Sequence, residues 1–171
     1  MLRLWLSAAW LIGSVVLANA ADTTVPGLNN TPSGPTGRWY SQDHSIVVQI
    51  APCGSQPSAQ LCGQIVGINL AHPNDPMPNN WQGQPQCGMT IIQTTESADT
   101  SSGTPHWHGT VVDPRNGNIY NATIALDPNR HLLLHGYLGL PIFGLTQTWD
   151  PYSGRTLANC KLAAATVSGA G

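Results

Sequence analysis

The stretch "PHWHGTVVDPRNGNIYNATIALDPNRHLLLHGYL", residues 105–138, decides the fold class. It contains three short runs rich in β-branched, aromatic and aliphatic residues, at 105–112, 118–126 and 131–138. Two turn signals, Asp113-Pro114-Arg115-Asn116-Gly117 and Asp127-Pro128-Asn129-Arg130, separate these runs. In each turn a proline fixes φ and the other residues tolerate the left-handed region. Consecutive hairpins of this kind predict an antiparallel meander.

The same pattern extends to both sides of this stretch. Further strand-like runs lie at 37–40, 44–50, 61–69, 88–95 and 143–149, which gives about eight strands in all. Such a meander buries its apolar face only if it folds over or closes, and closure also removes the exposed edges. We therefore expect an all-β fold, a single small antiparallel up-and-down barrel, with a two-sheet sandwich as the alternative.

Alternation along the runs predicts which side chains share the inner face. Gln147 is the polar member of an otherwise apolar set, because Leu145 and Trp149 share its parity. The other predicted sets are Trp107 with Val111, Tyr120 with Ala122, Ile124 and Leu126, and Leu132 with Leu134 and Leu138.

The N-terminal residues have the layout of a cleavable secretory signal. Arg3 precedes an apolar run at 4–17, and Ala18-Asn19-Ala20 follows it. We expect a signal peptide at 1–20, a flexible lead-in at 21–36, the barrel domain at 37–150 and a tail at 151–171. Two alternatives stay open for this tail, one short helix at 155–167 or an irregular segment. Cleavage would leave no membrane span, and the protein is expected in the periplasm or secreted.

Four cysteines, Cys53, Cys62, Cys87 and Cys160, follow the predicted signal. An even number in an exported chain predicts two disulfides, for which sequence alone allows three connectivities. We favour Cys53–Cys62 as a local link, because the pair flanks one turn, and Cys87–Cys160 as a long-range link. A zinc site is the alternative to the disulfides, although the sequence lacks the C-x-x-C spacing that is typical of zinc ligands.

Composition limits the class of partner. Charged residues make up 8% of the chain, and six Lys plus Arg against eight Asp plus Glu give a net charge of −2. Binding to nucleic acid needs a basic face that these residues cannot supply. Roughly 150 residues after the signal are enough for one domain, and we expect a monomer.

An ordered set of motifs carries a family resemblance. The set consists of Gly37-Arg38-Trp39, 45–50 (SIVVQI), 61–66 (LCGQIV), Pro85-Gln86-Cys87-Gly88, Trp107-x-Gly109, Asp113-Pro114-x-x-Gly117-x-x-Tyr120 and 136–149 (GYLGLPIFGLTQTW). Together they resemble the exported bacterial family known as domain of unknown function 2147. The resemblance implies a secreted or periplasmic bacterial β-domain.

A second, looser resemblance concerns the first strand. Gly37-Arg38-Trp39 resembles the G-x-W of lipocalin-type barrels, in which the tryptophan closes one barrel end. The chain departs from the pattern of the DUF2147 family that it resembles at His135, where members commonly carry arginine, and at Asp150, where they commonly carry a basic residue. These departures argue against an anion-binding role here.

Aromatic side chains and one amide are the candidate ligand contacts. They would suit a small apolar or sugar-like ligand held by stacking and a few hydrogen bonds; a packed core is the alternative. The loop at 71–86 could cover a ligand with Met77 and Trp81, or simply plug the barrel. The candidates are Trp39, Trp81, Trp107, Tyr120, Tyr137, Gln147 and Trp149.

Metal binding and catalysis find less support. His106 and His108 lie two apart on a strand and could reach one ion, but their parity places them on the solvent side. No short catalytic motif is present. We therefore expect no cofactor and a non-catalytic module that binds a small ligand or an envelope component. A hydrolase-like enzyme with an unrecognised site and a structural envelope protein are the alternatives.

Overall fold

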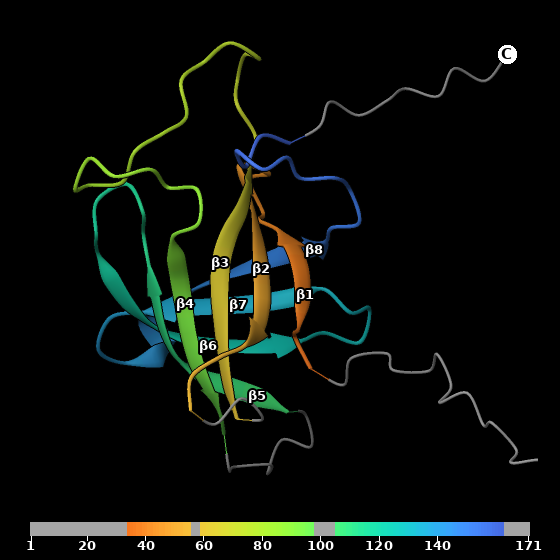
Figure 1. The fold of residues 1–171 in the computed structure, drawn as a ribbon. Coiled ribbons are helices and arrows are strands. Elements are labelled where there is room, and N and C mark those ends of the chain that lie inside the picture. The colour runs from red at the N-terminus through yellow and green to blue at the C-terminus, as the bar shows by residue number, and fades with distance from the viewer. Residues whose placement is uncertain (1–33, 56–58, 98–104, 163–171) are drawn as a thin grey trace, which may run out of the picture. The chain divides into compact units, whose positions relative to one another are not determined.

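Eight antiparallel strands close into a single barrel in chain order (Figure 1). The structure is a computed structural model that describes residues 34–55, 59–97 and 105–162. Each strand pairs with its neighbour in sequence, and β8 pairs with β1, so the predicted up-and-down barrel is confirmed and no sandwich forms. The strands are β1 (Gly37–Tyr40), β2 (Ile46–Pro52), β3 (Gln60–Ile68), β4 (Thr90–Glu96), β5 (His106–Val112), β6 (Ile119–Leu126), β7 (Leu132–Tyr137) and β8 (Leu145–Pro151).

The seam between β1 and β8 closes the barrel with a short ladder. Trp39 pairs with Pro151 and Tyr40 with Asp150. Beyond Tyr40 the side chain of Gln42 takes over, because its Oε1 accepts a 2.9 Å hydrogen bond from the backbone N–H of Thr148. A side chain therefore extends the seam past the end of the shortest strand.

The inner face of the strands carries the apolar core. Most of the predicted alternation is confirmed by burial. Two residues depart from it: Leu138 follows the end of β7 and is 64% exposed, so its predicted place in the core is wrong, and Leu145, which begins β8, is also exposed. The buried inward side chains include Trp39, Val48, Ile50, Leu61, Ile65, Ile92, Trp107, Ala122, Ile124, Leu132, Leu134 and Trp149.

A β-bulge in β4 changes which residues face inward. Gly63 pairs with Ile92 whereas Gln64 pairs with Thr90, so Ile91 is the additional residue. Such an insertion breaks strict alternation and redirects a side chain. Ile91 and Ile92 are consequently both buried although they are consecutive.

The two ends of the barrel differ. At one end, Trp39 and Trp107 fill the interior: the Trp39 indole donates a 2.7 Å hydrogen bond to the Pro35 carbonyl, and Gly34 packs against the Trp107 ring. The connections β1–β2, β3–β4, β5–β6 and β7–β8 gather at the other end, which we call the open end.

The described part of the tail covers the outside of the barrel. Lys161 forms a parallel bridge with Ile68, and Thr156 bridges Leu162. Leu162 packs over Gly67, the β3 partner of Val47, and Val47 is fully buried. No helix forms at 155–162, so the irregular alternative holds there, and 163–167 lies outside the described residues. Tertiary contacts override the helix propensity of this Ala- and Leu-containing segment.

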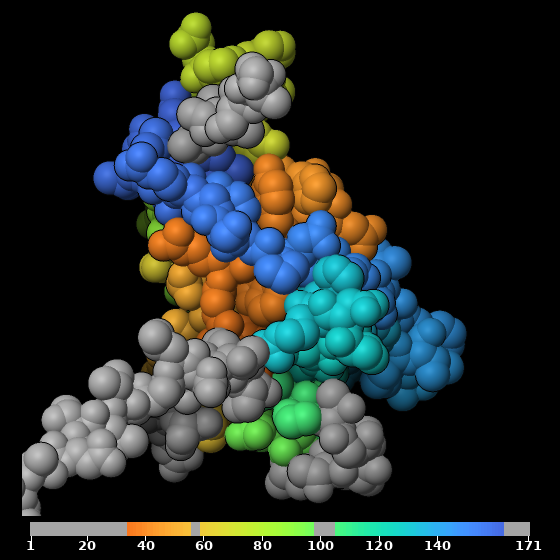
Figure 2. Space-filling view, turned by 90° about the vertical axis from the view of Figure 1, so that its right-hand side faces the viewer, coloured from red at the N-terminus to blue at the C-terminus, as the bar shows by residue number. Residues whose placement is uncertain are grey.

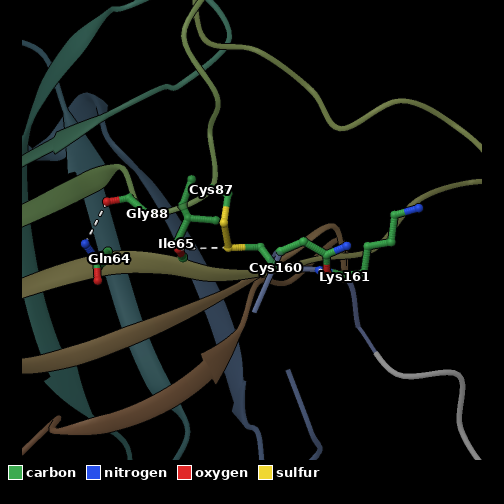
Figure 3. The surroundings of a disulfide bond; sticks show 7 residues. Gln64, Ile65, Cys87, Gly88, Cys160 and Lys161 are labelled. Atoms are coloured by element: carbon green, nitrogen blue, oxygen red, sulfur yellow. Dashed lines mark hydrogen bonds between the residues drawn. A yellow bond between two sulfur atoms is a disulfide. The ribbon is translucent and has the colours of Figure 1, made fainter. Parts of the chain in front are cut away.

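Both predicted disulfides form. Cys53–Cys62 links the end of β2 to β3, and Cys87–Cys160 links the β3–β4 connection to the tail (Figure 3). Next to the second bond, Gln64 donates a 2.7 Å hydrogen bond to the Gly88 carbonyl. Two disulfides are consistent with an extracellular or periplasmic location. Within the described ranges, no helix has the length and apolar character needed to cross a bilayer.

Candidate functional site

A cavity of about 710 Å³ occupies the interior at the open end. It exists because the inner row of β7 continues from Leu132 and Leu134 to Gly136, which has no side chain to fill the space. An added Cβ at Gly136 would come no closer than 3.8 Å to Val111 and 4.0 Å to Tyr120. The apolar part of the lining includes Ile46, Ile68, Leu70, Ile91, Val111, Leu134, Leu145 and Trp149.

Gln147 places an amide in this apolar wall. Its Oε1 accepts a 2.8 Å hydrogen bond from the indole Nε1 of Trp149, two residues along β8. The indole can only donate, so it fixes which end of the amide is the oxygen. The amide N–H₂ of Gln147 has no other partner among the described residues and is a donor available to a ligand.

Asp113 and Arg115 form a bidentate pair at the mouth of the cavity. Both residues belong to the β5–β6 turn, where Arg115 Nε and Nη2 donate to the two carboxylate oxygens of Asp113, each at 3.0 Å. The guanidinium holds the pKa of Asp113 below its usual value, chiefly through these hydrogen bonds. The pair is therefore ionised at neutral pH and offers no net charge.

Asp43 is a second carboxylate at the mouth, in the β1–β2 connection. Its Oδ1 accepts hydrogen bonds from the Ser41 hydroxyl at 2.7 Å and from the Ser45 hydroxyl at 2.8 Å. Burial acts to raise the pKa of Asp43, but these hydrogen bonds outweigh it, so the pKa lies below the usual value. Asp43 consequently carries a negative charge at neutral pH.

The long β3–β4 connection forms part of the wall. Pro76, Pro78 and Gln86 line the cavity, and Gln86 Nε2 donates a 3.0 Å hydrogen bond to the Asn79 carbonyl. Met77 packs against the core. This connection therefore narrows the open end and leaves the cavity accessible.

The structure brings together three of the seven predicted contacts. Tyr120, Gln147 and Trp149 line the cavity. The remaining four lie elsewhere: Trp39 and Trp107 are buried at the opposite end, Trp81 rests against Gly117 outside the lining, and the Tyr137 ring lies beside His135 with ring centroids 5.6 Å apart.

Sequence reasoning missed several lining residues. Ile91 enters the wall only because of the β4 bulge, which has no reliable local signature. Asp43 and Arg115 lie in turns, where turn formation accounts for them equally well. The sequence did contain a signal for the Asp113–Arg115 pair. Arg115 comes two residues after Asp113 in the same turn, and this spacing allows the two side chains to pair.

The paired histidines lie outside the cavity. The rings of His106 and His108 are perpendicular with centroids 4.9 Å apart, and His108 Nδ1 is 3.0 Å from the Thr123 hydroxyl. A smaller hollow of about 340 Å³ lies beside His108 and the Cys53–Cys62 disulfide. In the part of the chain that the structure describes, no three His, Cys, Asp or Glu side chains converge as metal ligands would.

Comparison with known proteins gives one match. A family model described as "Uncharacterized protein conserved in bacteria (DUF2147)" matches residues 37–151. These bounds are the first residue of β1 and the last residue of β8. No curated protein and no solved structure matches the chain. Because the match spans the whole barrel and more than half of the sequence, the chain belongs to the DUF2147 family of bacterial proteins.

Proposed function

We propose that the protein is an exported, non-catalytic binding module whose barrel holds a small amphiphile in the cavity at the open end. The cavity of about 710 Å³ carries this proposal, since pockets for small ligands usually measure about 300–1,000 Å³ and are mostly apolar. The leader at 1–20 directs the chain to the periplasm or the medium, and the mature barrel acts as a monomer.

The lining suggests the chemistry of the ligand. An apolar body fits between Val111, Leu134 and Trp149, while the Gln147 amide provides a hydrogen bond partway along the wall. The ionised carboxylates at the mouth disfavour an anionic head group, since only Arg115 offsets them there and Asp113 already pairs with it. The best fit is an uncharged or cationic amphiphile.

The same carboxylates favour binding over catalysis. A general acid or base works best when its pKa lies near the operating pH. The pKa values of Asp43 and Asp113 are instead lowered, because hydrogen bonds stabilise their charged forms. These groups therefore suit the role of hydrogen-bond acceptors.

Two measurements test the proposal. Native mass spectrometry of protein purified from its own compartment should show a bound mass that denaturation releases. Titration with the neutral fluorescent probe N-phenyl-1-naphthylamine should show saturable binding at one site. Protein that is consistently empty and does not bind the probe would overturn the proposal.

The substitution Gly136→Leu provides the specific control. It fills the cavity at a position where an added Cβ meets only ordinary contacts, and it should weaken probe binding at least ~10-fold while the fold is kept. Ala125→Leu adds similar bulk on the outward face of β6 and should leave probe binding unchanged.

A further inference from the structure

The connection between β7 and β8 exposes an uncharged apolar surface. We call residues 138–145, with the sequence LGLPIFGL, the apolar loop. Its five large apolar side chains are between 62% and 80% exposed, with Ile142 and Phe143 the most exposed. In Figure 2 the blue segment around residue 140 projects from the barrel at the right-hand side. A contiguous exposed apolar surface of this kind marks an interaction site.

The apolar loop has a defined shape. Pro141 begins a short 3₁₀ turn, Pro141–Phe143, closed by a 2.9 Å hydrogen bond from Gly144 N–H to the Pro141 carbonyl. His135 supports it from β7: its Nε2 donates to the same carbonyl at 2.9 Å, and its Nδ1 is hydrogen-bonded to the Thr146 hydroxyl at 2.9 Å. The barrel thus holds the turn while its apolar side chains face solvent.

The apolar loop lies at the mouth of the cavity. Leu145 is 71% exposed and also lines the cavity, so the exposed surface continues into the interior. Ile119, which begins β6 at the same end, is 60% exposed. A partner that covers the apolar loop would therefore also lie over the mouth of the cavity.

From this continuity we infer that the apolar loop inserts into the interfacial layer of a lipid bilayer and turns the cavity mouth toward the lipid. The inference rests on the proposed function, since an amphiphile for the cavity would be stored in a membrane. Insertion of exposed Leu, Ile and Phe side chains into the region between head groups and acyl chains is the chemistry that holds interfacial segments on membranes.

Charge selects the kind of bilayer. The apolar loop contains no charged residue. Three carboxylates, Asp43, Asp75 and Asp113, line the mouth with one cation, Arg115. A surface of this kind is not attracted to anionic lipid head groups. We therefore expect apolar contacts to drive binding and zwitterionic phosphatidylcholine to be sufficient for it.

Co-sedimentation of the mature protein with phosphatidylcholine vesicles tests the inference. The wild type should bind, and raising salt from about 0.05 to about 0.5 M or adding anionic lipid should not strengthen or abolish binding. The double variant Ile142→Ser/Phe143→Ser should bind at least ~10-fold more weakly, because two apolar side chains no longer insert. Its thermal melt should match the wild type, since both side chains are exposed.

Matched variants distinguish insertion of the apolar loop from nonspecific adhesion to vesicles. Leu157→Ser removes an exposed apolar side chain from the tail, far from the apolar loop in Figure 1, and should bind vesicles like the wild type. Gly136→Leu should lose the probe and keep vesicle binding, which separates failure of the cavity from failure of the loop. Absence of vesicle binding by the wild type, or equal binding by the double variant, would overturn the inference. A wild-type dimer that the double variant converts to monomer would also overturn it, because a second copy would then cover the apolar loop.

Discussion

The indole Nε1 of Trp149 donates a 2.8 Å hydrogen bond to the Oε1 of Gln147 across the inner face of β8. Trp149 is 3% exposed, so the one donor of its side chain depends on this amide. A polar residue inside the barrel thereby satisfies its neighbour and still presents a donor to the cavity.

Loss of this acceptor should destabilise the barrel. Gln147→Leu leaves the buried indole N–H without its partner, and we expect the free energy of unfolding to fall by about 1–2 kcal/mol in urea denaturation. In a Trp149→Phe background there is no indole N–H to leave unsatisfied. Gln147→Leu should therefore lower the free energy of unfolding by less in that background than in the wild type. Equal costs in both backgrounds would show that the hydrogen bond is not the cause.

The two disulfides should contribute unequally. The loop-entropy relation gives about 2.5 kcal/mol for Cys53–Cys62 and about 4.5 kcal/mol for Cys87–Cys160, because their separations are 9 and 73 residues. Paired Cys→Ser variants, compared by urea denaturation, should show this order. The reverse order would mean that native contacts, not loop length, set the contributions.

His131 should make stability depend on pH in one direction. Its ring is 2.9 Å from the Asp127 carboxylate, and this hydrogen bond raises the pKa of His131 above 6.5 and lowers the pKa of Asp127. A raised histidine pKa stabilises the folded state below pH 6.5 and loses that effect as pH rises through the folded pKa. The lowered pKa of Asp127 stabilises the folded state above pH 3.8, and this stabilisation is lost as the pH falls through the folded pKa.

A double-mutant cycle with His131→Gln and Asp127→Asn measures this coupling. Thermal melts should show a larger coupling between the two changes near pH 5.5, where the ring is charged, than near pH 8.5. Coupling of the same size at both values would show that the interaction does not require protonated His131.

Alanine substitutions at two glycines with the same φ distinguish backbone strain from a steric clash of the added Cβ. Gly117 and Gly83 both have φ near +77°, but only at Gly117 would a Cβ meet another residue, the Trp81 ring at 2.6 Å. Gly83→Ala should cost about 1 kcal/mol from backbone strain, and Gly117→Ala should cost more. The excess, measured by urea denaturation, should disappear in a Trp81→Ala background.

The barrel itself could be predicted because its signals are local. The turn at 113–117 and the alternation in β6 and β7 depend on neighbouring residues, and the structure reproduces both. The bulge at Ile91 and the tail bridge between Ile68 and Lys161 depend on residues distant in sequence, and no short pattern predicts them.

The candidate site was less accessible to sequence reasoning. Of the aromatic residues that the structure describes, Tyr120 and Trp149 reach the cavity, and their position follows from the register of the whole barrel. The apolar loop was misleading for a different reason. Leu138 and Phe143 are large apolar residues of the kind that usually lies in a core, and both are exposed in the structure.

The Cys87–Cys160 bond turns the second half of the barrel into a covalent ring that includes β4 to β8. A protease that cuts once within this ring, for example in the turn at 127–130, produces two chains that stay joined by sulfur. The nicked molecule should run as one band on a non-reducing gel and as two bands after reduction. In a compartment that contains proteases, the molecule could therefore survive a single cut with all its strands still attached.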